Sequence, residues 1–159
     1  MKEWFLVDHL DVEPLLAAWR WLCPHQMTLV AKTTFGDLFL RDEAGAVFWL
    51  NTSVGKLSQV ARSEAEFRKA AETEEKRAEW FAEQYTRLSA ERGLHPKPSQ
   101  CIGFSIPTVF AESASSTPYI ADIYEYLSFL GDLHRQISSA PDRTKAKLII
   151  HPPKPASGS

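Results

Sequence analysis

Five histidines have the widest chemical range in this sequence, and their spacing decides whether they could bind a metal ion. They are His9, His25, His95, His134 and His151. A metal-binding helix places two histidines within one turn of each other, and no pair here has that spacing. The sequence therefore predicts no metal site and no cofactor. His134 is the best single candidate for a role, although its place at the edge of an apolar helical stripe favours a core-edge histidine with one hydrogen bond.

Nucleophilic side chains are present, but the sequence marks no base beside them. Ser115, Ser116 and Thr117 offer hydroxyl groups without an evident activating group. The sequence has no nucleophile-elbow, Walker, dinucleotide-binding or paired-cysteine motif. Cys23 and Cys101 lie far apart, which predicts two buried free thiols. We therefore expect no enzyme activity and keep an uncharacterised enzyme as the minor alternative, recognisable by a concave pocket with strongly shifted pKa values.

Length and composition predict one globular domain. The chain has 159 residues, of which 44% are hydrophobic and 24% charged, and its net charge is −2. We expect a single domain over residues 1–151 and a disordered tail over 152–159. The charge argues against nucleic acid as the main partner. No apolar run approaches the roughly 20 residues that cross a bilayer, and the first residues lack a secretory signal, so we expect a cytoplasmic protein without a membrane partner.

The elements begin with a short helix and continue into a hairpin. Asp11 is suited to cap a helix that Pro24 ends, and Trp19 and Trp21 cannot share one face of that helix. Residues 27–33 and 36–41 follow as predicted strands. Residues 43–45 fit a three-residue hairpin loop closed by glycine, which would pair Phe39 with Trp49.

This register divides the hairpin into two faces. Leu38, Leu40, Phe48 and Leu50 form a core face, and the other face carries Asp37, Phe39, Arg41, Val47 and Trp49. The second face is either covered by the helical region that follows or exposed as a binding patch. Coverage is the favoured prediction. An exposed patch would indicate a small adaptor or regulatory module.

The helical region 63–92 supplies the candidate partner-binding residues. Ser63 and Glu66 form a capping box, a break is expected near Thr73, and Gly93 is suited to end a second helix. Acidic residues recur every four positions on the solvent side of that second helix, with a tryptophan beside them. A solvated face is the commoner explanation, and a docking edge for a cationic partner is the alternative. The candidate residues are Glu75, Glu79, Trp80 and Glu83.

The last third of the chain predicts a strand, a helix and a further strand. Residues 101–110 read as extended with Pro107 at an edge, residues 112–118 as a polar loop, and residues 122–139 as a helix. Residues 147–151 could add a final strand.

Several short segments together resemble one bacterial family. They are TFGDLFL (34–40), GAVFWL (45–50), VGKL (54–57), CIGF (101–104) with Ile106-Pro107, and GDLHRQI (131–137). In this combination the sequence resembles the C-terminal domain family of immunity proteins against DNase toxins of the type VI secretion system. Ala111-Glu112 and Arg143 depart from the family pattern, which affects the expected loop shapes.

The resemblance implies an α+β fold, with a mostly antiparallel sheet of about five strands and helices packed against it. It also implies a non-catalytic function, in which the protein binds a cognate toxin tightly and occludes it. A basic DNA-binding cleft on the toxin would suit the acidic row.

Overall fold

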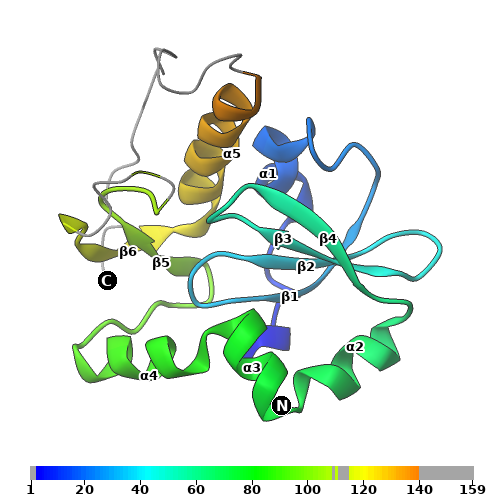
Figure 1. Ribbon diagram of the computed structural model, residues 1–159, viewed down its shortest axis with the longest axis horizontal. Helices are drawn as coiled ribbons and strands as arrows, with labels where there is room; N and C mark the ends of the chain where they lie inside the picture. Colours follow the sequence, from blue (N-terminus) through cyan, green and yellow to red (C-terminus); the bar gives the residue numbers. More distant parts are fainter. Residues whose placement is uncertain (1–2, 109, 111–114, 140–159) are drawn as a thin grey trace.

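The computed structural model describes residues 3–108, 110 and 115–139. Two 3-10 helices, η1 (Glu3–Phe5) and η2 (Ala17–Trp19), flank α1 (Val12–Leu16). Four strands follow, β1 (Thr28–Lys32), β2 (Leu38–Arg41), β3 (Val47–Asn51) and β4 (Lys56–Ala61). Next come α2 (Glu64–Ala71), α3 (Glu74–Phe81), α4 (Glu83–Glu91), β5 (Gln100–Phe104), β6 (Pro118–Asp122) and α5 (Ile123–Ser139). The predicted α+β class is confirmed (Figure 1).

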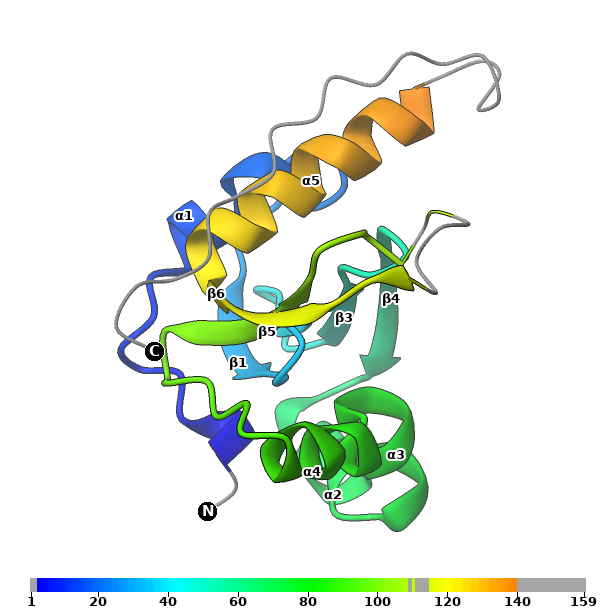
Figure 2. The ribbon, with the colours of Figure 1, turned by 90° about the vertical axis from the view of Figure 1, so that its left-hand side faces the viewer.

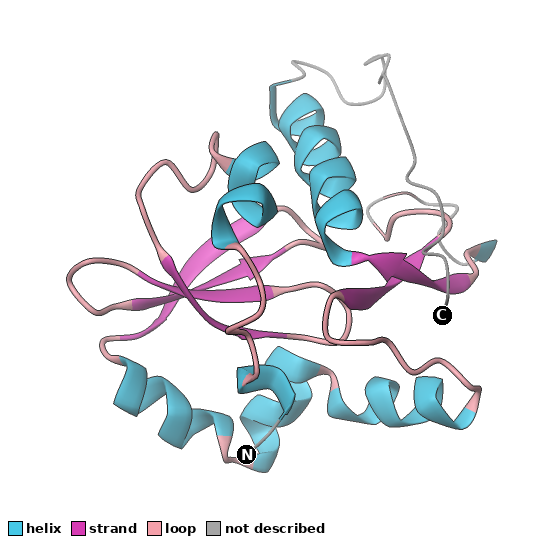
Figure 3. Cartoon of the chain, turned by 180° about the vertical axis from the view of Figure 1, so that it is seen from behind, coloured by secondary structure: helices cyan, strands magenta, loops and turns pink. Residues whose placement is uncertain are grey.

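The strands form two antiparallel sheets, where the sequence suggested one sheet of about five strands. One sheet has the order β1-β2-β3-β4, and the other pairs β5 with β6. The two sheets lie side by side when the molecule is seen from behind (Figure 3). The Ile102 N–H donates to the Thr34 carbonyl at 2.8 Å, which ties β5 to the turn between β1 and β2.

The predicted β2–β3 hairpin is confirmed in loop and register. Phe39 pairs with Trp49 and Leu40 with Phe48. Gly45 has a φ of +95°, and the Asp42 N–H donates to the Ala46 carbonyl across the loop at 3.0 Å. Glycine is required there because other L-residues rarely adopt a positive φ.

Helices cover both faces of the four-stranded sheet, with α1 and α5 above it and α2 and α3 below it in the view of Figure 1. On one face of the sheet, Leu38, Leu40 and Leu50 belong to a buried hydrophobic cluster that also contains side chains of α1 and α5. On the other face Phe39 is fully buried, with its ring centroid 4.8 Å from that of Phe67. The predicted coverage of this face is therefore confirmed at Phe39. The adaptor alternative needed this face to be exposed and loses its basis.

The helical region is broken twice. The expected break near Thr73 is confirmed, because the Thr73 hydroxyl caps α3 by accepting from the Lys76 N–H at 3.2 Å. A second break at Ala82, which has φ 48° and ψ 46°, separates α3 from α4. The prediction of one helix from the Thr73 break to Arg92 was therefore wrong. Gly93 ends α4 with a φ of +84° as expected, and the Leu94 N–H returns to the Ser89 carbonyl at 3.0 Å.

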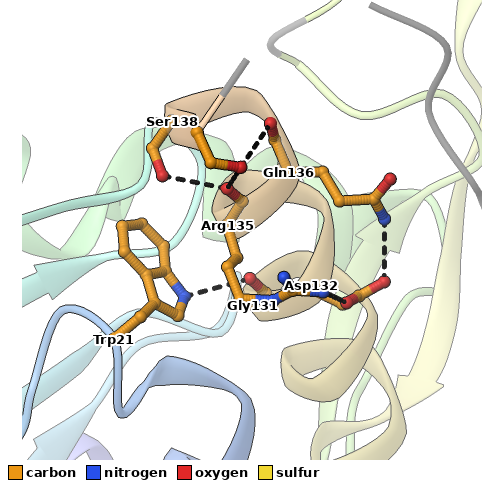
Figure 4. A network of polar contacts seen from close by, with 7 residues as sticks. Trp21, Gly131, Asp132, Arg135, Gln136 and Ser138 are labelled. Carbon is orange, nitrogen blue, oxygen red and sulfur yellow. Dashed lines mark hydrogen bonds and ion pairs between the residues drawn. The ribbon is translucent and has the colours of Figure 1, made fainter.

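The segment after α1 docks on α5 through two indole groups, one in η2 and one just beyond it. The helix expected to run to Pro24 is therefore shorter than predicted, because α1 ends at Leu16 and η2 at Trp19. Trp19 Nε1 donates to the Leu127 carbonyl at 2.9 Å, and Trp21 Nε1 to the Gly131 carbonyl at 3.2 Å. Figure 4 shows the Trp21 contact beside a polar network in which Asp132 accepts hydrogen bonds from Arg135 and Gln136. Trp19 is fully buried and Trp21 is half-buried. The prediction that they could not share one face was wrong, because their rings stack with centroids 6.1 Å apart and both indoles reach α5.

The C-terminal elements match the prediction in part. The helix at residues 122–139 is confirmed as α5, whereas the extended segment predicted for residues 101–110 ends as a strand at Phe104. The strand β6 at residues 118–122 was not predicted. The expected strand 147–151 and the expected tail 152–159 lie outside the described residues. Cys23 and Cys101 are buried free thiols, as predicted.

Candidate binding groove

A groove of about 650 Å³ lies where the two sheets meet α3 and α4. Figure 2 shows α3 and α4 below and the β5–β6 pair above. Its lining combines aromatic and apolar side chains with a few charged ones, and includes Asp37, Trp49, Trp80, Tyr85, Leu88 and Phe104. We call this feature the groove. Large apolar pockets with a few converging polar groups are the usual location of binding sites.

The backbone of Asp37 is fixed by the turn that joins β1 to β2. The Asp37 N–H donates to Thr33 Oγ1 at 3.0 Å, and the Thr33 N–H donates to the Asp37 carbonyl at 2.9 Å. Gly36 precedes Asp37 with a φ of +92°. A Cβ at Gly36 would lie 3.3 Å from a Leu127 methyl group, so glycine serves both the turn and the close approach of α5.

The Asp37 carboxylate accepts hydrogen bonds from two partners. Oδ1 lies 3.0 Å from the Thr52 N–H nitrogen and 3.0 Å from the Thr52 hydroxyl, and Oδ2 accepts from Trp49 Nε1 at 3.0 Å. The Thr52 hydroxyl has one hydrogen, so it donates either to Asp37 Oδ1 or to the Gly36 carbonyl, which lies 3.3 Å away. Donors surround Oδ1, while Oδ2 receives one hydrogen bond and keeps a second acceptor position.

Burial gives Asp37 an unusual charge balance. The residue is 9% exposed, and desolvation raises the pKa of its carboxyl from 3.8 to about 6, with the hydrogen bonds from Thr52 and Trp49 opposing that rise. No ion pair joins Asp37 to a cationic side chain in the part of the chain that the structure describes. At neutral pH the groove is therefore bordered by a carboxylate without a cationic neighbour.

The walls of the groove are aromatic on one side and helical on the other. Phe35 and Phe104 stack with centroids 6.0 Å apart and link the two sheets. On α4, Tyr85 and Leu88 are 65% and 41% exposed, and no residue of that helix is buried. Three positions apart on a helix, these two side chains share one face. Helix α4 thus presents large apolar side chains to the groove and to solvent.

The predicted partner-binding residues do not form one row. Glu75 and Glu79 lie on α3, but the break at Ala82 places Glu83 on α4, where it forms an ion pair with Arg77 at 3.0 Å. Glu79 pairs with Lys76 at 2.8 Å and lines the groove.

Trp80 corrects the expectation of an exposed anchor. It is only 3% exposed, because it packs on Phe39 and Phe67 at centroid distances of 5.6 and 5.1 Å. The large aromatic side chain of Trp80 on α3 covers Phe39. Trp80 therefore belongs mainly to the core, although it also lines the groove.

Sequence reasoning missed the groove itself. It placed Asp37 and Trp49 on one face of the hairpin, which is the arrangement that their hydrogen bond requires, but it assigned Asp37 no role. The available signal was an aspartate next to a buried strand and diagonal to a tryptophan on the same face.

His134 lies outside the groove, and its environment fits the core-edge interpretation. It is 4% exposed and its ring centroid lies 5.8 Å from that of Trp19. Burial lowers the pKa of its imidazole below 6.5, while hydrogen bonding to the backbone of Thr52 and Ser53 acts in the opposite direction. The histidine is therefore neutral at physiological pH.

The described residues form neither a metal-binding cluster nor a membrane-spanning helix. Over those residues, no three His, Cys, Asp or Glu side chains are grouped as a metal ion would require. None of the helices at residues 3–108 and 115–139 is both long and apolar enough to cross a membrane. No family model matches the sequence, and no curated protein matches it.

Proposed function

We propose that this protein is a non-catalytic immunity protein that binds a cognate secreted toxin, a nuclease of type VI secretion, in the cytoplasm of the producing cell. Neither nucleic acid nor a membrane is its partner in this proposal. The observation that carries it is the groove, whose outer wall exposes Tyr85 and Leu88. The sequence motifs that resemble the immunity family supply the kind of partner.

Exposed apolar side chains of this size are typical of binding surfaces. Leu6, Val54, Tyr85 and Leu88 are the large hydrophobic residues exposed in the described residues, and two of these four line the groove. Buried aromatic anchors contribute most of the free energy of a protein interface. A complex that buries roughly 1,200–2,000 Å² around such anchors could reach nanomolar affinity.

The acidic residues of α3 also favour the groove as the toxin-binding surface. Glu79 lines the groove, and Glu75 is exposed on the same helix one turn earlier. Acidic groups beside an apolar groove suit a toxin whose DNA-binding cleft is basic, since complementary charge accelerates association.

The enzyme alternative has one observation in its favour. Asp37 is a titratable group with a raised pKa in a concave site. Its carboxylate, however, is held by Thr52 and Trp49, and the hydroxyl that it contacts, Thr52 Oγ1, belongs to a fully buried residue that does not line the groove. A binding role accounts for Asp37 more simply.

The test is co-purification with the product of the adjacent toxin gene, followed by rescue of growth in cells that express that product. Tyr85→Ser and Leu88→Ser together should weaken the complex about a hundredfold, in line with two interface anchors. Val54→Ser removes an equally exposed apolar side chain outside the groove and should leave binding unchanged. A full-strength complex with the double variant would exclude the groove, and the lack of any complex or rescue would exclude the immunity function.

A further inference from the structure

The groove combines aromatic surfaces with one buried acid that has no cationic partner among the described residues. We propose that it recognises a lysine or arginine side chain of the partner protein, inserted along Trp49 and Tyr85 with its cationic head at Asp37 Oδ2. This inference rests on the proposed function, because it names the chemistry by which the toxin is held.

The charge of the groove favours a cationic ligand. Its charged lining residues are Asp37, Glu79 and Arg92. Glu79 is already paired with Lys76, and Arg92 is exposed at the end of α4. Asp37 is therefore the lining acid without an ion pair in the described chain, and a buried charge of this kind is stabilised by an incoming opposite charge.

The Asp37 carboxylate has an acceptor position that the described residues leave open. Thr52 supplies the donors at Oδ1, and Trp49 supplies the single hydrogen bond at Oδ2. A carboxylate oxygen can accept two hydrogen bonds, so Oδ2 can accept one more, and Asp37 lines the groove from which a donor would come. An ammonium or guanidinium N–H fits that position, and a charged donor makes the strongest such bond.

The other lining residues of the groove suit the stem of a long cationic side chain. Trp49 and Tyr85 offer ring faces and Leu88 an aliphatic surface. Lysine and arginine bury an apolar stem while their heads seek a polar group, and cations are attracted to aromatic faces. On α3, outside the groove lining, Lys76 Nζ makes a contact of this kind, 5.1 Å from the Trp80 ring centroid.

The experiment uses the whole protein, labelled with ¹⁵N, and three peptides that differ at one side chain. The peptides are Ac-Leu-Arg-Leu-NH₂, Ac-Leu-Lys-Leu-NH₂ and Ac-Leu-Cit-Leu-NH₂, in which citrulline is the neutral counterpart of arginine. The reporter is the indole N–H signal of Trp49, assigned by its loss in Trp49→Phe. The arginine and lysine peptides should shift this signal saturably, with about tenfold tighter binding than the citrulline peptide, since one charge-assisted hydrogen bond is involved.

Two variants separate recognition from folding. Asp37→Asn should remove the preference for arginine over citrulline while the remaining indole signals keep their positions. Tyr85→Ala, on a helix without buried residues, should weaken all three peptides. Equal binding of the arginine and citrulline peptides, or no shift at Trp49, would overturn the inference. Butylguanidinium that binds as tightly as the arginine peptide would also overturn it, by assigning the site to a small organic cation.

Failure here is distinguishable from failure of the proposed function. Peptides that do not discriminate, together with growth rescue by the toxin complex, would remove the cation site and leave the immunity function. Discriminating peptides without a toxin complex would leave the site and remove the immunity function.

Discussion

The indole Nε1 of Trp49 on β3 donates a hydrogen bond of 3.0 Å to Oδ2 of Asp37, the residue that leads into β2. This bond crosses the β2–β3 hairpin diagonally, on the sheet face that α2 and α3 cover. It holds the carboxylate at the edge of the groove, and it gives Trp49 a polar partner although its ring lies among apolar neighbours. Because both residues border the groove, a change in one should be measurable at the other.

Trp49→Phe should raise the pKa of Asp37 above its value of about 6, because the indole N–H stabilises the charged carboxylate. A rise of roughly half a unit to one unit is expected for one hydrogen bond. The measurement is a ¹³C NMR titration of the Asp37 carboxyl carbon. Trp21→Phe removes a comparable indole bond, to the Gly131 carbonyl, and should leave the Asp37 pKa unchanged. Equal pKa values in Trp49→Phe and the parent protein would refute the role of the bond.

Asp37 should make the folded state less stable as pH rises through the acid range. Its pKa is raised from 3.8 to about 6 on folding, so its contribution to the free energy of unfolding is full below about pH 4 and is lost as pH rises through 6. The size is roughly 2–3 kcal/mol at about 1.4 kcal/mol per pKa unit.

His134 acts in the opposite direction over part of that range. Its pKa is lowered from 6.5, so the stability it contributes is present above pH 6.5 and is lost on acidification. Asp37→Asn removes only the first effect, and should therefore lose more stability than the parent protein between about pH 7.5 and about pH 4.5. Urea unfolding at both pH values measures this. An unchanged pH dependence in Asp37→Asn would show that Asp37 does not titrate abnormally.

Gly55→Ala should cost about 2–4 kcal/mol, from backbone strain plus overpacking. Gly55 has a φ of +70°, and a Cβ there would lie 2.6 Å from Cγ and Nδ1 of His134. Gly45→Ala is the matched control, since Gly45 has a φ of +95° with no atom within 4 Å of an added Cβ, and should cost about 1 kcal/mol. Chemical denaturation gives both values. Similar losses for the two variants would mean that the ring of His134 moves aside without cost.

Reversing the charges of Glu75 and Glu79 should slow association with the toxin several-fold at low salt, and the difference should shrink as salt is added. Glu43→Lys, on the β2–β3 loop, should have no comparable effect. Glu83 is left out because its ion pair with Arg77 joins α3 to α4, so its reversal would also disturb the fold. Stopped-flow mixing at several salt concentrations measures the rates. Rates that match those of the parent protein at low salt would exclude α3 as a steering surface.

Local patterns were enough to predict the β2–β3 hairpin and α5. Alternation of apolar residues set the two faces, and glycine at position 45 set the loop, so both depended on neighbours along the chain. The break at Ala82 could not be predicted this way, since alanine favours helix. Tertiary packing decides it, because Trp80 and Phe81 are buried against Phe39.

The groove was beyond sequence analysis for a related reason. Its walls come from Asp37, Tyr85 and Phe104, which lie in three separate parts of the chain. These residues come together because β5 is hydrogen-bonded to the β1–β2 turn and pairs with β6. The strand β6 follows the segment 112–118, which was predicted as a polar loop. Sequence patterns therefore predicted the elements, while the site arises from their packing.

The left-handed residue Ala82 has a consequence for the motions of the protein. A non-glycine residue in that conformation costs about 1 kcal/mol, and α4 beyond it has no buried side chain to offset that cost. Its amides should exchange with solvent through small local openings, whereas those of the central strands β2 and β3 should exchange only when the whole domain unfolds. We therefore expect one wall of the groove to be fixed by the core and the other, α4, to shift with a bound side chain while the fold is kept.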